Sequence, residues 1–152
     1  MEKRSAGLLM FRRKGPEIEV LLVHPGGPYW AKRDQGAWTI PKGEYPDAED
    51  PLSAARREFE EETGFAPLGD LIPLTEVKQA GGKVVRAWAV EGDLDASAVR
   101  SNTFTMEWPP GSGRMRQFRE VDRAEWFPID AARAKINKAQ IRLLDELISK
   151  LS

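Results

Sequence analysis

The sequence predicts one α/β domain that covers residues 1–152. The length is that of one ordinary domain, and the chain shows no internal repeat, low-complexity tract or linker. Short apolar segments rich in β-branched and aromatic residues recur along most of the chain and predict strands. Two further segments carry apolar residues at helical spacing, which predicts helices that each lay one face on a core.

The N-terminal elements are predicted from hydrophobic runs and turn residues. Residues 4–13 and 17–25 are apolar and β-rich, and the intervening KGPE predicts a tight turn between two strands. Residues 26–36 contain glycine and proline together with aromatic and cationic side chains, which predicts a loop. Residues 37–43 predict a short strand that Pro41 and Gly43 bring to an end.

The same signals continue after residue 70. Residues 71–79 and 82–93 predict strands paired through the glycines between them, and 102–108 predict another strand. The basic, glycine-containing segment 109–120 predicts a loop. Residues 124–129 lead into a final helix from about Asp130 to Leu151, because apolar residues recur there at helical spacing: Ile141, Leu144, Leu147, Ile148 and Leu151.

A helix is predicted from about Pro51 to Thr63. Asp50 before Pro51 fits an N-cap and first helical position, and Gly64 is a natural stop. At about 100° per residue, apolar side chains fall within one arc that should face the core: Leu52, Ala55 and Phe59.

Carboxylates crowd the neighbouring arc of this helix. Glu58, Glu61 and Glu62 converge within one turn at spacings that place side chains next to each other. Like charges so placed destabilise a helix, and a divalent cation offsets that cost because Mg²⁺ takes oxygen ligands. Arg57 lies within reach to orient the Glu61 carboxylate. For these glutamates taken alone, a solvated charged face is the favoured alternative.

The segment from Gly43 to Phe65 resembles the Nudix hydrolase signature at nine positions of fixed spacing over 23 residues. The matching positions are Gly43, Glu49, Arg57, Glu58, Phe59, Glu61, Glu62, Gly64 and Phe65. WTIPKGE before the box and EWF late in the chain are also similar to that family. The resemblance implies the Nudix fold, a mixed sheet sandwiched between helices with a loop-helix-loop motif.

The resemblance also implies Mg²⁺- or Mn²⁺-dependent hydrolysis of a nucleoside diphosphate linked to another group. It assigns the metal ligands and the residues that position them as follows: Glu58, Glu61 and Glu62 as ligands, a backbone carbonyl of Lys42 or Gly43 as a further ligand, and Glu49 and Arg57 as residues that hold the ligands. Family members supply one more carboxylate from outside the box, as a ligand or a base. Glu120, six residues before Trp126, is our choice, and Glu107 is the alternative.

Two cationic loops are candidates for substrate binding. Aromatic and basic side chains that could stack on a base and grip phosphates are Tyr29, Trp30, Lys32, Arg33 and, beside the box, Lys42. Arg114, Arg116 and Arg119 form a second cluster that could bind far phosphates. Packing on the domain and solvated basic loops are the alternatives. Arg4, Lys83 and Arg86 lie on candidate strands and could point into the cleft, but side chains that face outward are favoured. His24 could act as a base, but a hydrogen-bonded residue at the end of a strand is favoured.

The amino-acid composition limits the kinds of binding partner that are expected. With 23 Lys and Arg against 24 Asp and Glu, no basic surface for a nucleic-acid polymer or a membrane is expected. No cysteine is present, and the apolar runs are too short for a membrane span or secretory signal, so a cytoplasmic protein is expected. A small-molecule nucleotide substrate and a monomer or homodimer are expected.

The substrate is not fixed by the box. Within the Nudix family, ADP-ribose hydrolases tend to carry a proline, and many dinucleoside polyphosphate hydrolases a tyrosine, roughly fifteen to eighteen residues beyond the box. Residues 80–83 fill that window with neither marker. A dinucleoside polyphosphate or nucleoside triphosphate is favoured because two cationic loops suit a long polyphosphate. ADP-ribose or another nucleotide sugar, and a non-catalytic nucleotide sensor, remain the alternatives.

Overall fold

A computed structural model of the chain describes residues 3–152. The main sheet is mixed and seven-stranded, with strand order β4-β6-β1-β2-β9, while β3 pairs with β1 and β5 pairs with β6. Its strands are β1 (Lys3–Lys14), β2 (Glu17–Pro25), β3 (Lys42–Glu44), β4 (Leu71–Pro73), β5 (Val77–Gln79), β6 (Lys83–Glu91) and β9 (Val121–Pro128). A separate two-stranded sheet joins β7 (Thr103–Glu107) to β8 (Met115–Arg119).

Side-chain alternation along the central strands builds two cores, one on each face of the sheet. In β1, Leu8 and Met10 belong to one buried cluster, and Leu9 and Phe11 belong to the other. This is the period-two pattern of a strand that is covered on both faces. β1 lies between β2 and β6, so these clusters form under the centre of the sheet.

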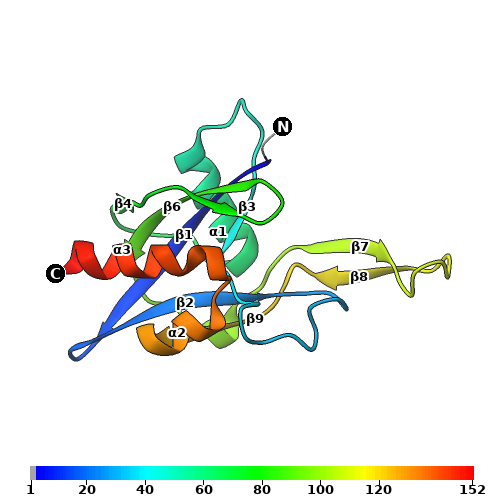
Figure 1. Ribbon diagram of the computed structural model, residues 1–152. Coiled ribbons are helices and arrows are strands. Elements are labelled where there is room, and N and C mark those ends of the chain that lie inside the picture. Colours follow the sequence, from blue (N-terminus) through cyan, green and yellow to red (C-terminus); the bar gives the residue numbers. More distant parts are fainter. Residues whose placement is uncertain (1–2) are drawn as a thin grey trace.

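Helices cover the two faces separately (Figure 1). Helix α1 (Pro51–Thr63) supplies Phe59 to the cluster that contains Leu8. Helices α2 (Ile129–Lys135) and α3 (Ile141–Leu151) pack on the other face, where Leu144 joins the cluster that contains Leu9. The expected sandwich of a mixed sheet between helices is therefore confirmed.

Most of the predicted strands and the first helix are confirmed. The β1–β2 hairpin has antiparallel register around the expected turn, and β5 pairs with β6 across the glycines between them. The range of α1 is the predicted one. The segment 71–79 forms two strands rather than one, β4 and β5, which both pair with β6.

Two expectations for the segments around the site are wrong. Residues 37–43 do not form one strand: Trp38 and Thr39 make only isolated bridges, and the strand begins at Lys42, where it pairs with β1. Residues 109–120 are not all loop, because Met115–Arg119 forms β8. Residues 124–129, predicted only as an approach to the last helix, lie mostly within β9.

The predicted final helix is interrupted. Ile136 has an extended backbone and makes a parallel bridge to Trp38, and the Asn137 amide donates to the Trp38 carbonyl at 2.7 Å. A short 3-10 helix, η2 (Lys138–Gln140), then leads into α3. The helix stops because this segment pairs with residue 38. Within residues 3–152, none of the helices has the length and apolar character needed to cross a bilayer.

Candidate active site

Helix α1 is a well-capped platform for the acidic side chains. The Asp50 carboxylate accepts from the Ser53 amide at 3.0 Å, and Pro51 occupies the first turn. Gly64 ends the helix with φ 82°, a left-handed conformation that favours glycine, and its amide donates to the Glu60 carbonyl at 2.8 Å. Phe59 is fully buried, which fixes the rotation of the helix on the sheet.

Arg57 draws three carboxylates together. Its Nε and Nη2 atoms donate to both oxygens of Glu49, at 2.9 and 2.8 Å. Its Nη1 atom donates to Glu58 at 2.8 Å and to both oxygens of Glu61 at 3.1 Å. These hydrogen bonds, first those to Glu49, raise the pKa of Arg57 and hold the pKa of Glu49 below its usual range. Arg57 is therefore hydrogen-bonded to Glu49 on one side and to the Glu58 and Glu61 carboxylates on the other.

Strand β3 brings the start of the box against the helix. A Cβ atom on Gly43 would overlap the carboxylate of Glu58, so only glycine permits this approach. The Lys42 amide donates to Glu62 Oε1 at 3.1 Å. Strand β3 therefore lies directly against the Glu58 and Glu62 side chains.

Burial shapes the electrostatics of this cluster. Burial raises the pKa of Glu58, against the opposing effect of Arg57, and raises the pKa of Glu62 to about 8. Burial, and then the negative charge of Glu61, raises the pKa of Glu120. The negative charge of Glu120 in turn acts on Glu58 and Glu62, so the carboxylate outside the box belongs to the same electrostatic cluster.

Backbone hydrogen bonds place Glu120 beside the end of α1. The Asn102 amide donates to the Glu61 carbonyl at 3.0 Å, and the Glu120 amide donates to the Asn102 carbonyl at 2.9 Å. The Gly26 amide donates to the Glu120 carbonyl, also at 2.9 Å. Segments far apart in the sequence therefore meet at one point, which no local sequence pattern could have indicated.

The carboxylate cluster fits a divalent metal ion, although no such site is preformed. Among residues 3–152, no group of three or more His, Cys, Asp or Glu side chains is already arranged to hold a metal. Arg57 engages Glu58 and Glu61, and the Lys42 amide engages Glu62. Carboxylate and carbonyl oxygens are nevertheless the donors that hard divalent cations take. A bound cation would share these oxygens with Arg57.

A pocket of about 240 Å³ opens beside the cluster. Its lining residues are Pro25, Trp30, Ala37, Thr39, Lys42, Gln79, Ala80, Lys83, Asn137 and Gln140. Lys42 connects the pocket to the carboxylates, and burial, followed by the positive charge of Lys83, lowers its pKa. Two cations and an exposed aromatic ring thus line a hollow next to the acidic residues.

The structure places the other predicted substrate-binding residues in two groups. Trp30 lines the pocket, and the Arg33 guanidinium lies over its ring at 5.3 Å; Lys32 lies on the same exposed loop. Tyr29 instead contacts Trp108, and Arg114 and Arg116 lie on the β7–β8 hairpin. That hairpin projects from the body of the molecule (Figure 1).

Two alternatives from the sequence are placed outside the acidic cluster. The Glu107 carboxylate accepts from the amides of Gly111 and Gly113, at 2.8 and 3.2 Å, and so holds the turn of the β7–β8 hairpin. His24 is fully buried and lies between Asp122 and the Arg33 carbonyl, at 2.8 and 2.6 Å. His24 is therefore a hydrogen-bonded residue at the end of a strand, as expected.

Sequence reasoning missed several pocket residues. Lys83 is exposed at the start of β6 and lines the pocket, which was the less favoured of its two predicted positions. Gln140 is fully buried and accepts from the Ile40 amide at 3.0 Å while donating to Gln79 at 2.7 Å. The break in the last helix brings Asn137 and Gln140 here, and the helical periodicity gave no sign of that break.

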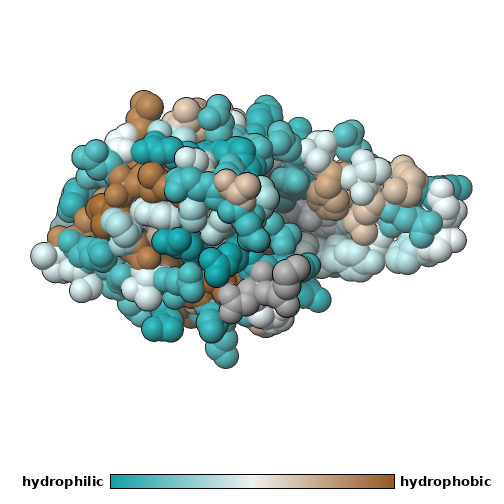
Figure 2. Space-filling view, turned by 90° about the horizontal axis from the view of Figure 1, so that it is seen from above, coloured by the Kyte–Doolittle hydropathy of each residue, from teal (hydrophilic) through white to brown (hydrophobic). Residues whose placement is uncertain are grey.

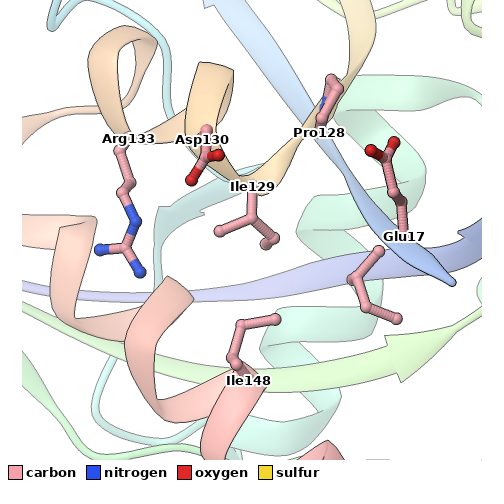
Figure 3. A pocket seen from close by; sticks show the side chains of 7 residues that line it. Glu17, Pro128, Ile129, Asp130, Arg133 and Ile148 are labelled. Atoms are coloured by element: carbon pink, nitrogen blue, oxygen red, sulfur yellow. The ribbon is translucent and has the colours of Figure 1, made fainter.

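Another cavity, of about 370 Å³, is larger than the pocket beside the carboxylates but lies on the other face of the sheet. Ile129 of α2 and Ile148 of α3 line it together with Glu17, Asp130 and Arg133 (Figure 3). Ile18 and Ile129 pack on the core cluster beneath α2 and α3, not on the cluster beneath α1. Size alone therefore does not identify the site, because the acidic residues lie on the α1 side.

Comparison with known proteins gives a family match and curated relatives that include a longer protein. The model of the NUDIX domain matches residues 1–147. An octanoyltransferase from Myxococcus xanthus is 30% identical over 131 residues, which are 85% of this chain and 32% of that protein. The chain therefore spans about a third of the length of the curated relative that it matches.

Solved structures with the same fold cover nearly the whole chain. A Caenorhabditis elegans Ap4A hydrolase in a binary complex matches with a TM-score of 0.67 and 24% identity, over 98% of this chain and 97% of that one. The NUDIX domain of Shewanella oneidensis NrtR, complexed with ADP ribose, matches with a TM-score of 0.68 and 16% identity, over 100% and 90% of the two chains. At these identities the likeness shows the fold.

Proposed function

The chain belongs to the Nudix hydrolase family, whose members act on pyrophosphate bonds, and we propose that it hydrolyses a dinucleoside polyphosphate or a nucleoside triphosphate. The observation that carries the proposal is the convergence of the box glutamates with Glu120. These carboxylates influence one another's pKa across two separate segments of the chain. Arg57 offsets part of the repulsion within this cluster, and a divalent cation bound there would offset more of it while contacting a polyphosphate.

We infer that the metal is Mg²⁺ or Mn²⁺. The donors available around Gly43 are oxygen atoms, and this set suits hard cations. The residues that would hold the metal are Glu58, Glu61, Glu62, a carbonyl at Gly43 and Glu120. When bound, such a cation neutralises charge on the diphosphate and lowers the pKa of an attacking water.

The chain's own residues have distinct proposed roles. Arg57 fixes the Glu58 and Glu61 carboxylates through hydrogen bonds and is itself fixed by Glu49. Glu120 lies at the junction of three segments beside Glu61, where it can accept a proton from the attacking water or serve as a metal ligand.

The pocket beside the cluster is the proposed site for the nucleoside next to the scissile bond. The Trp30 ring offers a stacking surface, and Lys42 and Lys83 offer positive charge to phosphates. Because Lys42 also contacts Glu62 through its amide, a ligand in the pocket lies next to the carboxylates.

Catalysis is favoured over a purely nucleotide-sensing role. A sensor needs to bind nucleotide but does not need the metal-binding carboxylates, and this chain keeps every position of the box. Hydrolysis of ADP-ribose or a nucleotide sugar is the second candidate, since a Nudix domain of similar fold is complexed with ADP ribose.

Product analysis over a nucleotide panel tests the proposal. Diadenosine tetraphosphate, ATP and ADP-ribose are incubated with the protein in ¹⁸O-labelled water, with Mg²⁺, Mn²⁺ or EDTA. The expected result is metal-dependent cleavage of the first or second compound, with ¹⁸O identifying the phosphorus attacked. Cleavage of ADP-ribose alone would select the second candidate. Binding of nucleotides with no hydrolysis in either metal would support the sensor.

A further inference from the structure

The β7–β8 hairpin is an arm with a half-buried apolar face. It forms its own two-stranded sheet and projects from the body of the protein, with hydrophobic side chains exposed among hydrophilic ones (Figures 1 and 2). Phe104 pairs with Phe118 in the register, and Met106 pairs with Arg116. A two-stranded hairpin is at best marginally stable alone. The arm is therefore expected to pack against something else.

The loop at residues 26–33 covers only part of that face. A Cβ atom on Gly27 would lie 3.0 Å from the Phe104 ring, so the ring lies directly over this glycine. The Tyr29 ring meets the Trp108 ring edge to face, with centroids 5.2 Å apart. Tyr29 is 58% exposed, so one side of this aromatic pair is open.

Arg114 lies beside the open aromatic pair, and Arg116 lies further back along the same face of the arm, opposite Met106. The Trp108 amide donates to the Arg114 carbonyl at 2.9 Å, which places Arg114 directly opposite Trp108. Arg116 lies over the Phe118 ring at 5.7 Å. Among residues 3–152, neither Arg114 nor Arg116 forms an ion pair, and the nearby Glu107 is engaged by backbone amides. We call Tyr29, Trp108, Arg114 and Arg116 the arm site.

The arm starts from the same part of the protein that holds the carboxylate cluster. The arm leaves the body between Asn102 and Glu120, which are hydrogen-bonded to each other beside Glu61. Trp108 lies six residues beyond Asn102, which corresponds to about 20 Å along an extended strand. A mononucleotide held at the carboxylates would not reach Trp108, but a second nucleoside on a polyphosphate chain would.

A second nucleoside also needs a second place. The pocket at Trp30 and Lys42 has about 240 Å³, which is below the range of about 300–1,000 Å³ for a drug-sized ligand and leaves room for one nucleoside at most. We propose that the arm site binds the distal nucleoside and far phosphates of a dinucleoside polyphosphate, with the base on Tyr29 and Trp108 and the phosphates at Arg114 and Arg116. This inference depends on the proposed function.

The test compares substrates that do and do not have a distal nucleoside. For Trp108→Ala, the ratio of kcat/KM for diadenosine tetraphosphate to kcat/KM for ATP is expected to fall about tenfold or more, as for loss of one base-stacking ring. Trp108→Phe keeps an aromatic surface and is expected to restore most of the ratio. Arg114→Ala is expected to lower it in the same direction.

Met115→Ala is the matched control. Met115 is 65% exposed and pairs with Glu107, on the face of the arm opposite to Phe104, so both kcat/KM values should stay at wild-type level. The arm site would be rejected if the ratio of the two kcat/KM values were unchanged in a folded Trp108→Ala protein. It would also be rejected if the wild-type protein hydrolysed ATP but not diadenosine tetraphosphate. Tighter binding of a single-stranded oligonucleotide than of the dinucleotide would do the same.

Failure of the proposed function gives a different result. The wild-type protein would then hydrolyse neither compound with either metal. Calorimetry with diadenosine tetraphosphate would still decide the arm site: weaker binding to Trp108→Ala than to Met115→Ala would support it, and equal or absent binding would reject it.

Discussion

One guanidinium explains how the acidic residues coexist. From sequence, the cost of crowding Glu58 and Glu61 was expected to be offset by a metal ion, with Arg57 orienting one carboxylate. In the structure, Arg57 contacts Glu49, Glu58 and Glu61 at the same time. Charge-assisted hydrogen bonds of this kind are roughly twice as strong as neutral ones. The chain therefore holds its carboxylates in place before any cation binds.

Replacing Glu61 by glutamine should remove function without removing the fold. Its side chain is 35% exposed and is not part of the hydrophobic core, so the melting temperature should change little. Turnover at saturating Mg²⁺ should fall by about 100-fold or more, because charge stabilisation in the transition state is lost. Steady-state kinetics on Glu61→Gln measure this.

Glu60→Gln is the control for that substitution. Glu60 is exposed on the same helix, so the turnover of the Glu60→Gln protein should remain at the wild-type value. Wild-type turnover in Glu61→Gln would remove Glu61 from the mechanism.

At the scale of elements, local signals predicted α1 and β7 but not β8, the second strand of the arm. Asp50, Pro51 and Gly64 are cap residues whose effect is local, so the helix could be read directly. Strand β8 contains only one half-buried side chain, Phe118, among exposed residues, and a strand without a buried face lacks the alternation that identifies strands. Strand β8 is identified only by its pairing with β7 in the structure. Glu120 was chosen by its resemblance to the family pattern, but its hydrogen bonds to Asn102 and Gly26 could be found only in the folded structure.

Helix α1 should lose most stability through its buried ring. Phe59 is fully buried in the core, and Phe59→Ala should lower the free energy of unfolding by about 3–5 kcal/mol. Leu52 is only half-buried, so Leu52→Ala should cost less. Urea denaturation of both variants measures which one loses more free energy of unfolding. A larger loss for Leu52→Ala would mean that the helix is rotated differently on the sheet.

The loop that precedes the box should be held by a pH-dependent contact. The Asp34 carboxylate meets the Lys135 ammonium of α2 and accepts from Trp38 Nε1 at 2.8 Å. The contact with Lys135, and then that with Trp38, holds the pKa of Asp34 below its ordinary value. Because the folded pKa lies below the unfolded one, Asp34 stabilises the protein above the unfolded value, and this stabilisation disappears as the pH falls through the folded value.

The matching variant is Asp34→Asn, which removes the charge but keeps an acceptor for Trp38. Its melting temperature should be lower than that of the wild type at pH 7, and the difference should shrink as the pH is lowered through about 4. Asp70→Asn, at an exposed position, serves as the control. A difference that stays constant from pH 7 to pH 3 would contradict the role of the Asp34 charge.

At the scale of the whole molecule, the site forms where separate parts of the chain meet. Gly43 of β3, Glu58 of α1 and Glu120 after β8 come from three regions of the sequence. Each is held by the sheet or by backbone hydrogen bonds, so the carboxylates are brought close only in the folded state. A ligand that needs all of them binds the native protein and not the unfolded chain, and it must therefore raise the stability of the whole fold.

Mg²⁺ or Mn²⁺ should accordingly raise the melting temperature. At a metal concentration of ~100 times Kd the gain is about 2.7 kcal/mol, which corresponds to roughly 5 to 10 °C for a chain of this size. Thermal melts with metal, with EDTA and with NaCl at equal ionic strength separate specific binding from screening. Glu61→Gln should lose much of the shift while melting normally in EDTA. If neither metal shifts the wild-type melt even with nucleotide present, the glutamates do not form a metal site, and Arg57 alone must account for their convergence.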